Sequence, residues 1–237
     1  FGDLDGDGLP DLYVANYRSS TIMDEPGTRF TLGTRGGRMA VTRVNGQPVT
    51  NPDYVDRFAM GTTGSPREVG EPDCLYRNLG GGRFERWPLG GGSFADEAGR
   101  PIEEPLDWGL AVMIRDLNGD GRADIYVCND ADSPDRIWMN QGGGRFRALG
   151  VAALRHISLS SMGVDVADLN RDGEDDIFVV DMLARSHAKR LTQLEKSARP
   201  RFAPGDFLNR PQYPRNTLFL NQGGGVYSEI AHYAGLH

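Results

Sequence analysis

The sequence lacks features that several large classes of protein require. Its 237 residues include only two cysteines, Cys74 and Cys128, and these do not form a Cys-x-x-Cys motif, so zinc-binding and thioredoxin-type chemistry are not indicated. No apolar run approaches the roughly 20 residues that a membrane-spanning helix needs. Lysine and arginine (26) are outnumbered by aspartate and glutamate (33), and there is no basic stripe, so nucleic acid is not an expected partner.

Motifs of common enzyme classes are absent as well. The sequence contains neither a Gly-x-Ser-x-Gly nucleophile motif nor a His-Glu-x-x-His zinc motif. The four histidines are scattered and have no evident catalytic partner: His156, His187, His232 and His237. The sequence therefore predicts a protein that is not an enzyme, and it indicates no catalytic residue.

Glycine and repeated acidic loops are abundant. The 32 glycines exceed an average usage of about 7 per cent, as expected of a chain with many turns. Three nine-residue segments, 3–11, 116–124 and 168–176, carry Asp or Asn at positions 1, 3, 5 and 9 and glycine at position 6. Carboxylates crowded in this way repel one another. A hard divalent cation with about six to eight oxygen ligands removes the repulsion.

Each acidic loop is therefore predicted to bind one Ca²⁺, with a backbone carbonyl at position 7 as an additional ligand. The predicted ligands are Asp3, Asp5, Asp7, Leu9 and Asp11 in loop 1, Asp116, Asn118, Asp120, Arg122 and Asp124 in loop 2, and Asp168, Asn170, Asp172, Glu174 and Asp176 in loop 3. The alternative is that the Asp-Gly and Asn-Gly pairs only make hairpin turns. Turn chemistry explains the glycine but not the recurring carboxylates.

The residues that follow each loop exclude an EF-hand. That motif needs a bidentate Glu at position 12 and flanking helices, whereas all three loops have valine there. Short apolar, β-rich runs follow instead, at 12–15, 125–128 and 177–180, and these predict strands. Because the runs are continuously apolar, we expect neighbouring sheets to cover both faces of these strands.

A second element recurs downstream of each loop, at residues 75–84, 137–146 and 218–227. It consists of an apolar segment ending in Asn, a glycine triplet and a further short segment. A phosphate-binding loop would need a helix N-terminus after the glycines, so a two-stranded hairpin is the preferred interpretation. With one strand before the acidic loop and one after it, the unit has four strands at a period of about 50 residues, which is typical of a β-propeller blade.

The predicted fold class is therefore all-β, a β-propeller segment of about three four-stranded blades with calcium loops between strands one and two. Residues 1–90 are predicted to form a blade that lacks its first strand, 108–150 a minimal blade, and 160–232 a third blade. Insertions at 17–73 and 181–215 separate the second and third strands of the first and third blades. Alternate connections of a blade emerge at opposite ends, so the insertions are expected opposite the calcium loops, where they can form a binding surface.

The two insertions differ in character. The first contains an extra hairpin with a turn at Asn45-Gly46 and then a segment, 51–73, predicted to be irregular. The second contains a basic stretch, 186–197, that is compatible with a helix and is either solvated or a contact for an acidic protein or glycan. Several aromatic residues either anchor a partner or pin the insertions to the blades: Tyr54, Phe58, Phe202, Phe207 and Tyr213.

Together the loops and hairpins resemble the FG-GAP or VCBS repeats of integrin-α-type propellers. Trp108-Gly109 before the second loop and residues 212–216 before the last hairpin extend the resemblance to the branch that contains cartilage acidic protein and the bacterial ASPIC/UnbV proteins. The resemblance implies a calcium-binding propeller, usually seven-bladed. It also implies an extracellular, cell-surface or periplasmic location and a role in adhesion through protein or glycan contacts.

Three blades do not close a ring, because propellers have about four to eight. The chain is therefore expected to be a piece of a longer polypeptide, or a partner chain completes it. Some enzymes resemble this family, so a carbohydrate-active lyase or dehydratase is one alternative, which a convergent His, Tyr and Arg cluster on the insertion face would favour. A purely architectural accessory subunit is another. Cys128 is predicted to be a small core residue, with a Cys74 to Cys128 disulfide between adjacent blades as the alternative.

Overall fold

The computed structural model describes residues 1–22, 24–61, 64–130, 133–182, 184, 186, 188–189, 192 and 210–236. The protein is all-β, with nineteen strands assigned in this part of the chain. The strands are β1 (Leu12–Val14), β2 (Phe30–Arg35), β3 (Arg38–Val44), β4 (Gln47–Pro48), β5 (Phe58–Met60), β6 (Pro66–Glu68), β7 (Cys74–Asn78), β8 (Phe84–Trp87), β9 (Phe94–Ala95), β10 (Gly109–Arg115), β11 (Asp124–Asn129), β12 (Arg136–Asn140), β13 (Phe146–Ala148), β14 (Ile157–Ser158), β15 (Ser161–Ala167), β16 (Asp176–Asp181), β17 (Gln212–Tyr213), β18 (Thr217–Asn221) and β19 (Tyr227–Glu229). No helix in these residues has the length and hydropathy needed to cross a membrane.

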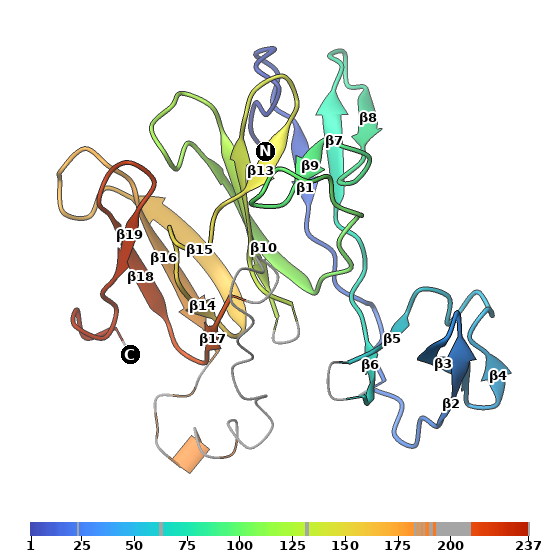
Figure 1. Cartoon of the computed structure of the whole chain (residues 1–237). Coiled ribbons are helices and arrows are strands. Elements are labelled where there is room, and N and C mark those ends of the chain that lie inside the picture. Colours follow the sequence, from blue (N-terminus) through green and yellow to red (C-terminus); the bar gives the residue numbers. More distant parts are fainter. Residues whose placement is uncertain are drawn as a thin grey trace.

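Three sheets stand side by side in the body of the molecule (Figure 1). Sheet 1 has the order β1-β7-β8, sheet 2 the order β10-β11-β12-β13, and sheet 3 the order β15-β16-β18-β19, with antiparallel neighbours throughout. The apolar runs after the acidic loops form β1, β11 and β16, and the glycine triplets connect the two strands of each hairpin, so both of these strand predictions are confirmed. The described residues do not close the sheets into a ring.

Sheet 2 has a fifth strand that the repeat pattern does not predict. β9 lies parallel to β13, and the Ser93 carbonyl accepts the Phe146 N–H at 2.8 Å. The connection between sheets 1 and 2 thus runs along the outer strand of sheet 2. Phe94 stacks on Phe146 with ring centroids 4.8 Å apart, and this contact stabilises the pairing of β9 with β13.

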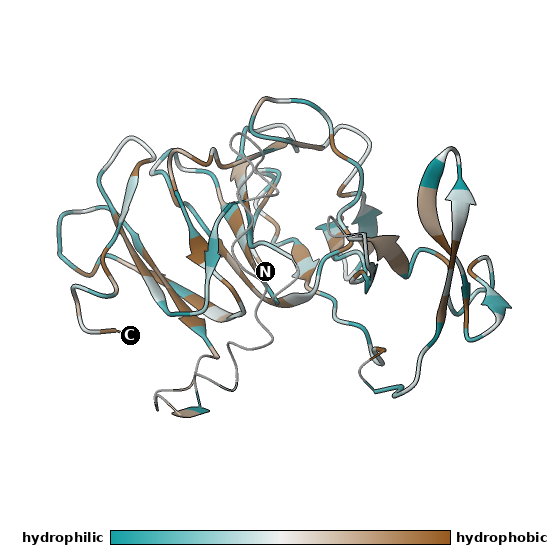
Figure 2. Cartoon of the chain, turned by 60° about the horizontal axis from the view of Figure 1, so that its bottom comes forward, coloured by the Kyte–Doolittle hydropathy of each residue, from teal (hydrophilic) through white to brown (hydrophobic). Residues whose placement is uncertain are grey.

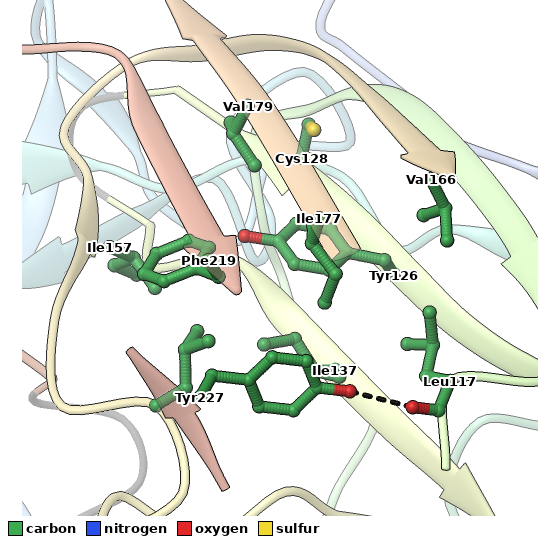
Figure 3. Close-up of a cluster of buried hydrophobic side chains, with 11 residues drawn as sticks. Leu117, Tyr126, Cys128, Ile137, Ile157, Val166, Ile177, Val179, Phe219 and Tyr227 are labelled. Atoms are coloured by element: carbon green, nitrogen blue, oxygen red, sulfur yellow. Dashed lines mark hydrogen bonds between the residues drawn. The ribbon is translucent and has the colours of Figure 1, made fainter. Parts of the chain in front are cut away.

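The continuous apolar run of β11 is explained by its position between two other sheets. Ile125 and Val127 pack into a core cluster with sheet 1, whereas Tyr126 and Cys128 pack into a cluster with sheet 3 (Figure 3). All six residues of β11 are buried. The expectation that neighbouring sheets cover both faces is confirmed for β11 but not for β1 and β16, which lie in the outer sheets and are partly exposed. The core position of Cys128 is confirmed. Cys74 and Cys128 are both free thiols.

The acidic loops and glycine hairpins gather at one end of the sheets, at the top of Figure 1, and strands β2 to β6 of the first insertion lie beyond the other end. We call residues 30–68 the lobe. The expectation that 51–73 is irregular is wrong, because β5 and β6 form a hairpin there, held by an edge contact of Phe58 with Phe30 at 5.2 Å. The predicted helical stretch at 186–197 lies mostly outside the described residues.

Candidate metal centre

The three acidic loops share one backbone arrangement, built around the Asp at position 1. In loop 2, Asp116 Oδ1 accepts the N–H of Gly119 at 2.8 Å, and Oδ2 accepts the N–H of Gly121 at 2.7 Å. The glycine at position 6 of the other two loops donates the same bond to Asp3 or Asp168 at 3.0 Å. This glycine has a φ of +85°, +82° or +92°, a conformation that side chains disfavour, so glycine is required there.

Loop 1 brings three acidic side chains together. One carboxylate oxygen from each of Asp3, Asp5 and Asp11 lies within 4.8 Å of the others. In the part of the chain that the structure describes, no other group of three acidic, His or Cys side chains lies so close. The Arg77 guanidinium contacts Asp5 and balances part of this charge. Acidic oxygen donors on a sharp turn are suited to a hard cation such as Ca²⁺. Asp7 is exposed, and its Oδ1 accepts the Leu9 N–H at 2.8 Å.

Loops 2 and 3 have Asn in place of Asp at position 3, and their carboxylates do not gather as closely. Asn118 and Asn170 each accept the N–H of position 5 at 3.1 Å, and each Nδ2 donates to the carboxylate at that position. In loop 2, Asp120 also contacts the guanidinium of Arg122. Both loops retain the oxygen donors expected of a calcium site, with one neutral amide oxygen in place of a carboxylate.

The Asp at position 9 joins each loop to the glycine hairpin of its own sheet. Asp124 is fully buried, and its two oxygens accept the Leu117 N–H at 2.9 Å and the Asn140 N–H at 2.7 Å. Asp11 and Asp176 accept the same two bonds in loops 1 and 3. Burial raises the pKa of Asp124 to about 6, although the two N–H bonds oppose the rise. A carboxylate has about four lone-pair positions, so these bonds leave room for a cation.

The hairpin asparagine of sheet 2 reaches across to the preceding loop. Asn140 Nδ2 donates to the Ala123 carbonyl of loop 2 and to the Leu4 carbonyl of loop 1, both at 2.9 Å. Its Oδ1 accepts the Gly142 N–H at 2.9 Å, so the whole side-chain amide is used. Loop 1 is therefore held by sheet 2 as well as by its own sheet.

The same connection occurs between loop 2 and sheet 3. Asn221 Nδ2 lies 3.4 Å from the Leu117 carbonyl and 3.2 Å from the Asp175 carbonyl. Tyr227 Oη donates a further bond of 2.7 Å to the Leu117 carbonyl (Figure 3). Neither the loop motif nor the hairpin motif predicts this contact, because each motif is local in the sequence and the bond joins different repeats.

Replacing Asn140 tests this connection. Asn140→Ala leaves two carbonyls and one N–H without their partner, so we expect the free energy of unfolding to fall by about 2 to 3 kcal/mol. Urea unfolding measures the change. Gln141→Ala, a change at the exposed neighbour, is the matched control and should stay within about 0.5 kcal/mol of the parent. Equal effects of the two substitutions would show that the bonds between sheets contribute little.

The opposite end of the sheets holds a second repeated polar network. The Tyr13 hydroxyl donates to Asp73 and the Tyr126 hydroxyl to Asp135, both at 2.8 Å. Asp135 also accepts a 2.7 Å bond from Ser161 in sheet 3, and burial raises its pKa to about 6. Asp73 instead faces Gly109 of sheet 2, where a Cβ would lie 2.7 Å from Asp73 Oδ1. All of these side chains are buried, and the bond between Asp135 and Ser161 joins sheets 2 and 3, so the network is structural.

A buried ion pair lies near this network. Arg136 donates to both oxygens of Asp107, at 2.6 and 2.8 Å, and each side chain is 9% exposed. Arg136 begins β12, whereas Asp107 belongs to the connection that enters sheet 2. Sheets 1 and 3 have Cys74 and Thr217 at the position of Arg136, so the repeat pattern gives no signal for the pair.

His156 and Glu229 line a cavity of about 360 Å³, and Arg215 and Tyr213 lie beside them. Arg215 donates to Glu229 Oε2 at 2.9 Å, and its Nη2 lies 3.0 Å from His156 Nε2. Burial lowers the pKa of His156, so the neutral ring accepts from Arg215. Tyr213 contacts the His156 ring edge-on at 5.3 Å. The cluster therefore links the segment after β17 to β19.

Comparisons with known proteins match this architecture in part. Residues 116–179, from loop 2 into β16, match a family model described as an FG-GAP-like repeat. The chain is similar to cartilage acidic protein 1 of Mus musculus, with 24% identity over 190 residues, which cover 78% of this chain and 29% of that protein. The chain thus spans 29% of the length of this curated relative.

A solved structure described as specific recognition of non-reducing terminal N-acetylglucosamine by an Agrocybe aegerita lectin aligns with 92% of this chain and 78% of its own. The identity is 15% and the TM-score is 0.23, so this likeness supports no conclusion about fold or ligand.

Proposed function

We propose that the chain forms a calcium-binding β-propeller module of an extracellular adhesion or binding protein. Two comparisons support this: residues 116–179 match an FG-GAP-like repeat, and the chain is similar to cartilage acidic protein 1. Protein or glycan contacts would be made by the insertions between the second and third strands. The module would act as a rigid frame, and loops carried on a rigid frame are where binding residues concentrate.

The observation that carries this proposal is the convergence of Asp3, Asp5 and Asp11 in loop 1. Like charges within 4.8 Å raise the energy of the loop unless a cation neutralises them. Loops 2 and 3 repeat the hydrogen bonds of positions 1 and 9, so we extend the calcium role to all three. The ion would supply positive charge, while Asp124 and its two counterparts position the loop backbone.

Calcium titration of the EGTA-stripped protein by isothermal calorimetry tests the proposal. We expect three ions per chain, with Mg²⁺ binding more weakly because it requires a stricter octahedral geometry. The double variant Asp3→Ala/Asp5→Ala should bind one ion fewer and keep the remaining two. A chain that binds no calcium, or a double variant that binds as many ions as the parent, would refute the role of loop 1.

The contacts of the His, Tyr and Arg cluster bear on the alternative of a carbohydrate-active enzyme. Such a cluster on the insertion side was the feature expected to favour an enzyme. Its polar atoms are engaged with one another, as Glu229 Oε1 also accepts the Ala231 N–H at 2.7 Å. We retain a non-enzymatic binding module as the proposal because the sequence carries no motif of a common enzyme class, and we assign no catalytic residue. A carbohydrate-active enzyme stays the alternative that this cluster favours. An architectural role within a larger assembly is the remaining alternative.

A further inference from the structure

The lobe contains five arginines and three acidic residues, a formal charge of +2, and its basic residues are concentrated in its first part. Residues 26–52 contain four arginines and no acidic residue, although the whole chain has a formal net charge of −7. The remaining residues therefore carry −11, from 22 basic and 33 acidic side chains. All four arginines of this segment are exposed: Arg29, Arg35, Arg38 and Arg43. Positive charge is thus concentrated on one hairpin of an otherwise acidic protein.

Two of these arginines face each other across the hairpin. β2 and β3 are joined at Gly36 and Gly37, whose φ angles of +57° and +76° permit the tight turn, and Arg35 pairs directly with Arg38. Like charges directly opposite in an antiparallel pair are destabilising. Neither side chain has an acidic partner in the described residues. Carboxylates supplied from outside would relieve the repulsion.

A groove with both polar and apolar walls lies beside Arg35. It encloses about 250 Å³, and its apolar wall residues include Met39, Val55, Phe58 and Met60, whereas Arg35, Thr50 and Asp56 are its polar ones. Met39 is 62% exposed and Val55 51% exposed, although both are apolar. Figure 2 shows hydrophilic residues near the turn of the β2–β3 hairpin and hydrophobic residues along its strands. The groove can therefore accept an apolar side chain close to positive charge.

The strand that contributes Arg35 to the groove, β2, is open along one edge. In the sheet order β2-β3-β4, β2 is an edge strand and has no partner beyond β3 among the described residues. An extended peptide can pair with such an edge through main-chain hydrogen bonds, with its side chains entering neighbouring pockets. A saccharide has no backbone that could pair in this way.

We infer that the β2–β3 hairpin and its groove bind an extended acidic segment of a partner protein. An apolar side chain of that segment enters the groove beside Met39, and its carboxylates meet Arg35 and Arg38. This inference rests on the proposed function in one respect, which is that the insertions form the binding surface. It adds the chemical class of the partner and the residues that contact it.

Selection from a displayed library of random 12-residue peptides tests the inference, with the calcium-loaded whole chain as bait. We expect enrichment of peptides that combine several Asp or Glu with at least one large apolar residue. The selected peptide is then synthesised, and its Kd is measured by fluorescence anisotropy. Arg35→Glu/Arg38→Glu should weaken binding by about tenfold or more. Added salt should weaken it as well, because exposed charges are screened.

The matched control is Arg83→Glu/Arg145→Glu, which changes the net charge equally at two exposed arginines on the glycine hairpins of the blade sheets. It should leave the peptide Kd within about twofold, since electrostatic contacts between exposed charges act over about 8 to 10 Å in salt. Met39→Ala separates the apolar contact from the charge and should weaken binding without changing its salt dependence. Circular dichroism and calcium stoichiometry check that each variant is folded.

Several results would overturn the inference. Failure to enrich any peptide, enrichment without an excess of acidic residues, or equal effects of the two charge reversals would each reject it. Heparin binding that is lost in Arg35→Glu/Arg38→Glu, without acidic peptides, would identify an anionic glycan as the ligand. Self-association lost in the same variant would identify a second copy. In all these cases a normal calcium stoichiometry would leave the calcium part of the proposed function intact.

Discussion

Chelation of calcium with EGTA is expected to lower the melting temperature by roughly 15 to 30 °C. Binding to the native state alone contributes RT ln(1 + [L]/Kd), or about 2.7 kcal/mol per site at a calcium concentration of one hundred times Kd. Three sites would contribute about 8 kcal/mol, and each kcal/mol shifts the melting temperature of a protein of this size by about 2 to 4 °C. Differential scanning fluorimetry with and without EGTA measures the shift.

The physical reason for so large an effect lies in where the loops are attached. Asp124 and its counterparts bond to the hairpin of the same sheet, and Asn140 and Asn221 bond to the loop of the preceding sheet. Loss of the ion from a loop therefore weakens contacts within one sheet and between two. Re-addition of Ca²⁺ should restore the melting temperature more effectively than the same concentration of Mg²⁺. A shift of less than about 3 °C would contradict the structural role of calcium.

Asp107→Ala is expected to lower the free energy of unfolding by about 3 to 5 kcal/mol, because it removes the carboxylate that pairs with the buried Arg136 guanidinium. The pair is bidentate and both side chains are 9% exposed. Asp107 also lies where the first insertion returns to the body, with a bridge to Glu71. Urea unfolding followed by tryptophan fluorescence provides the measurement.

Two further variants separate the charge from the packing at this site. Glu104→Ala removes one partner of the exposed ion pair with Arg86 at 3.0 Å and should cost at most about 1 kcal/mol. The double variant Asp107→Ala/Arg136→Met removes both buried charges and should recover most of the lost stability, since an apolar replacement of a buried pair is often neutral. If Asp107→Ala were no more destabilising than Glu104→Ala, the buried pair would contribute no more to stability than an exposed one.

The agreement between sequence and structure is greatest where a pattern repeats. β1, β11 and β16 form at the predicted apolar runs, and Cys128 lies in the core, because each of these features depends on a local hydrophobic pattern. Gly109, part of the resemblance to the repeat family, proves to be a point of close approach, where a side chain would contact Asp73. A pattern that occurs three times supports a strand prediction more strongly than a single occurrence does.

The differences occur where no repeat supplies a pattern. β5 and β6 were expected to be irregular, since Pro66 and the polar residues around them resemble a loop in isolation, yet packing of Phe58 on Phe30 orders the hairpin. β9 belongs to the connection between sheets 1 and 2, and it pairs with β13, which lies far from it in the sequence. Short strands of two or three residues depend on partners that are distant in the sequence, so local composition cannot reveal them.

The sequence by itself determined the all-β class, the strands that follow the acidic loops, the glycines with positive φ at position 6 and the oxygen-rich composition of the three loops. These follow from local rules of turn geometry and hydrophobic pattern. Only the tertiary structure decided that Asp3, Asp5 and Asp11 converge, that Asn140 bonds to loop 1 and that Arg35 faces Arg38 beside an open groove. The physical reason is that a pattern in one segment specifies which groups it offers, whereas the distance between groups depends on how separate segments pack.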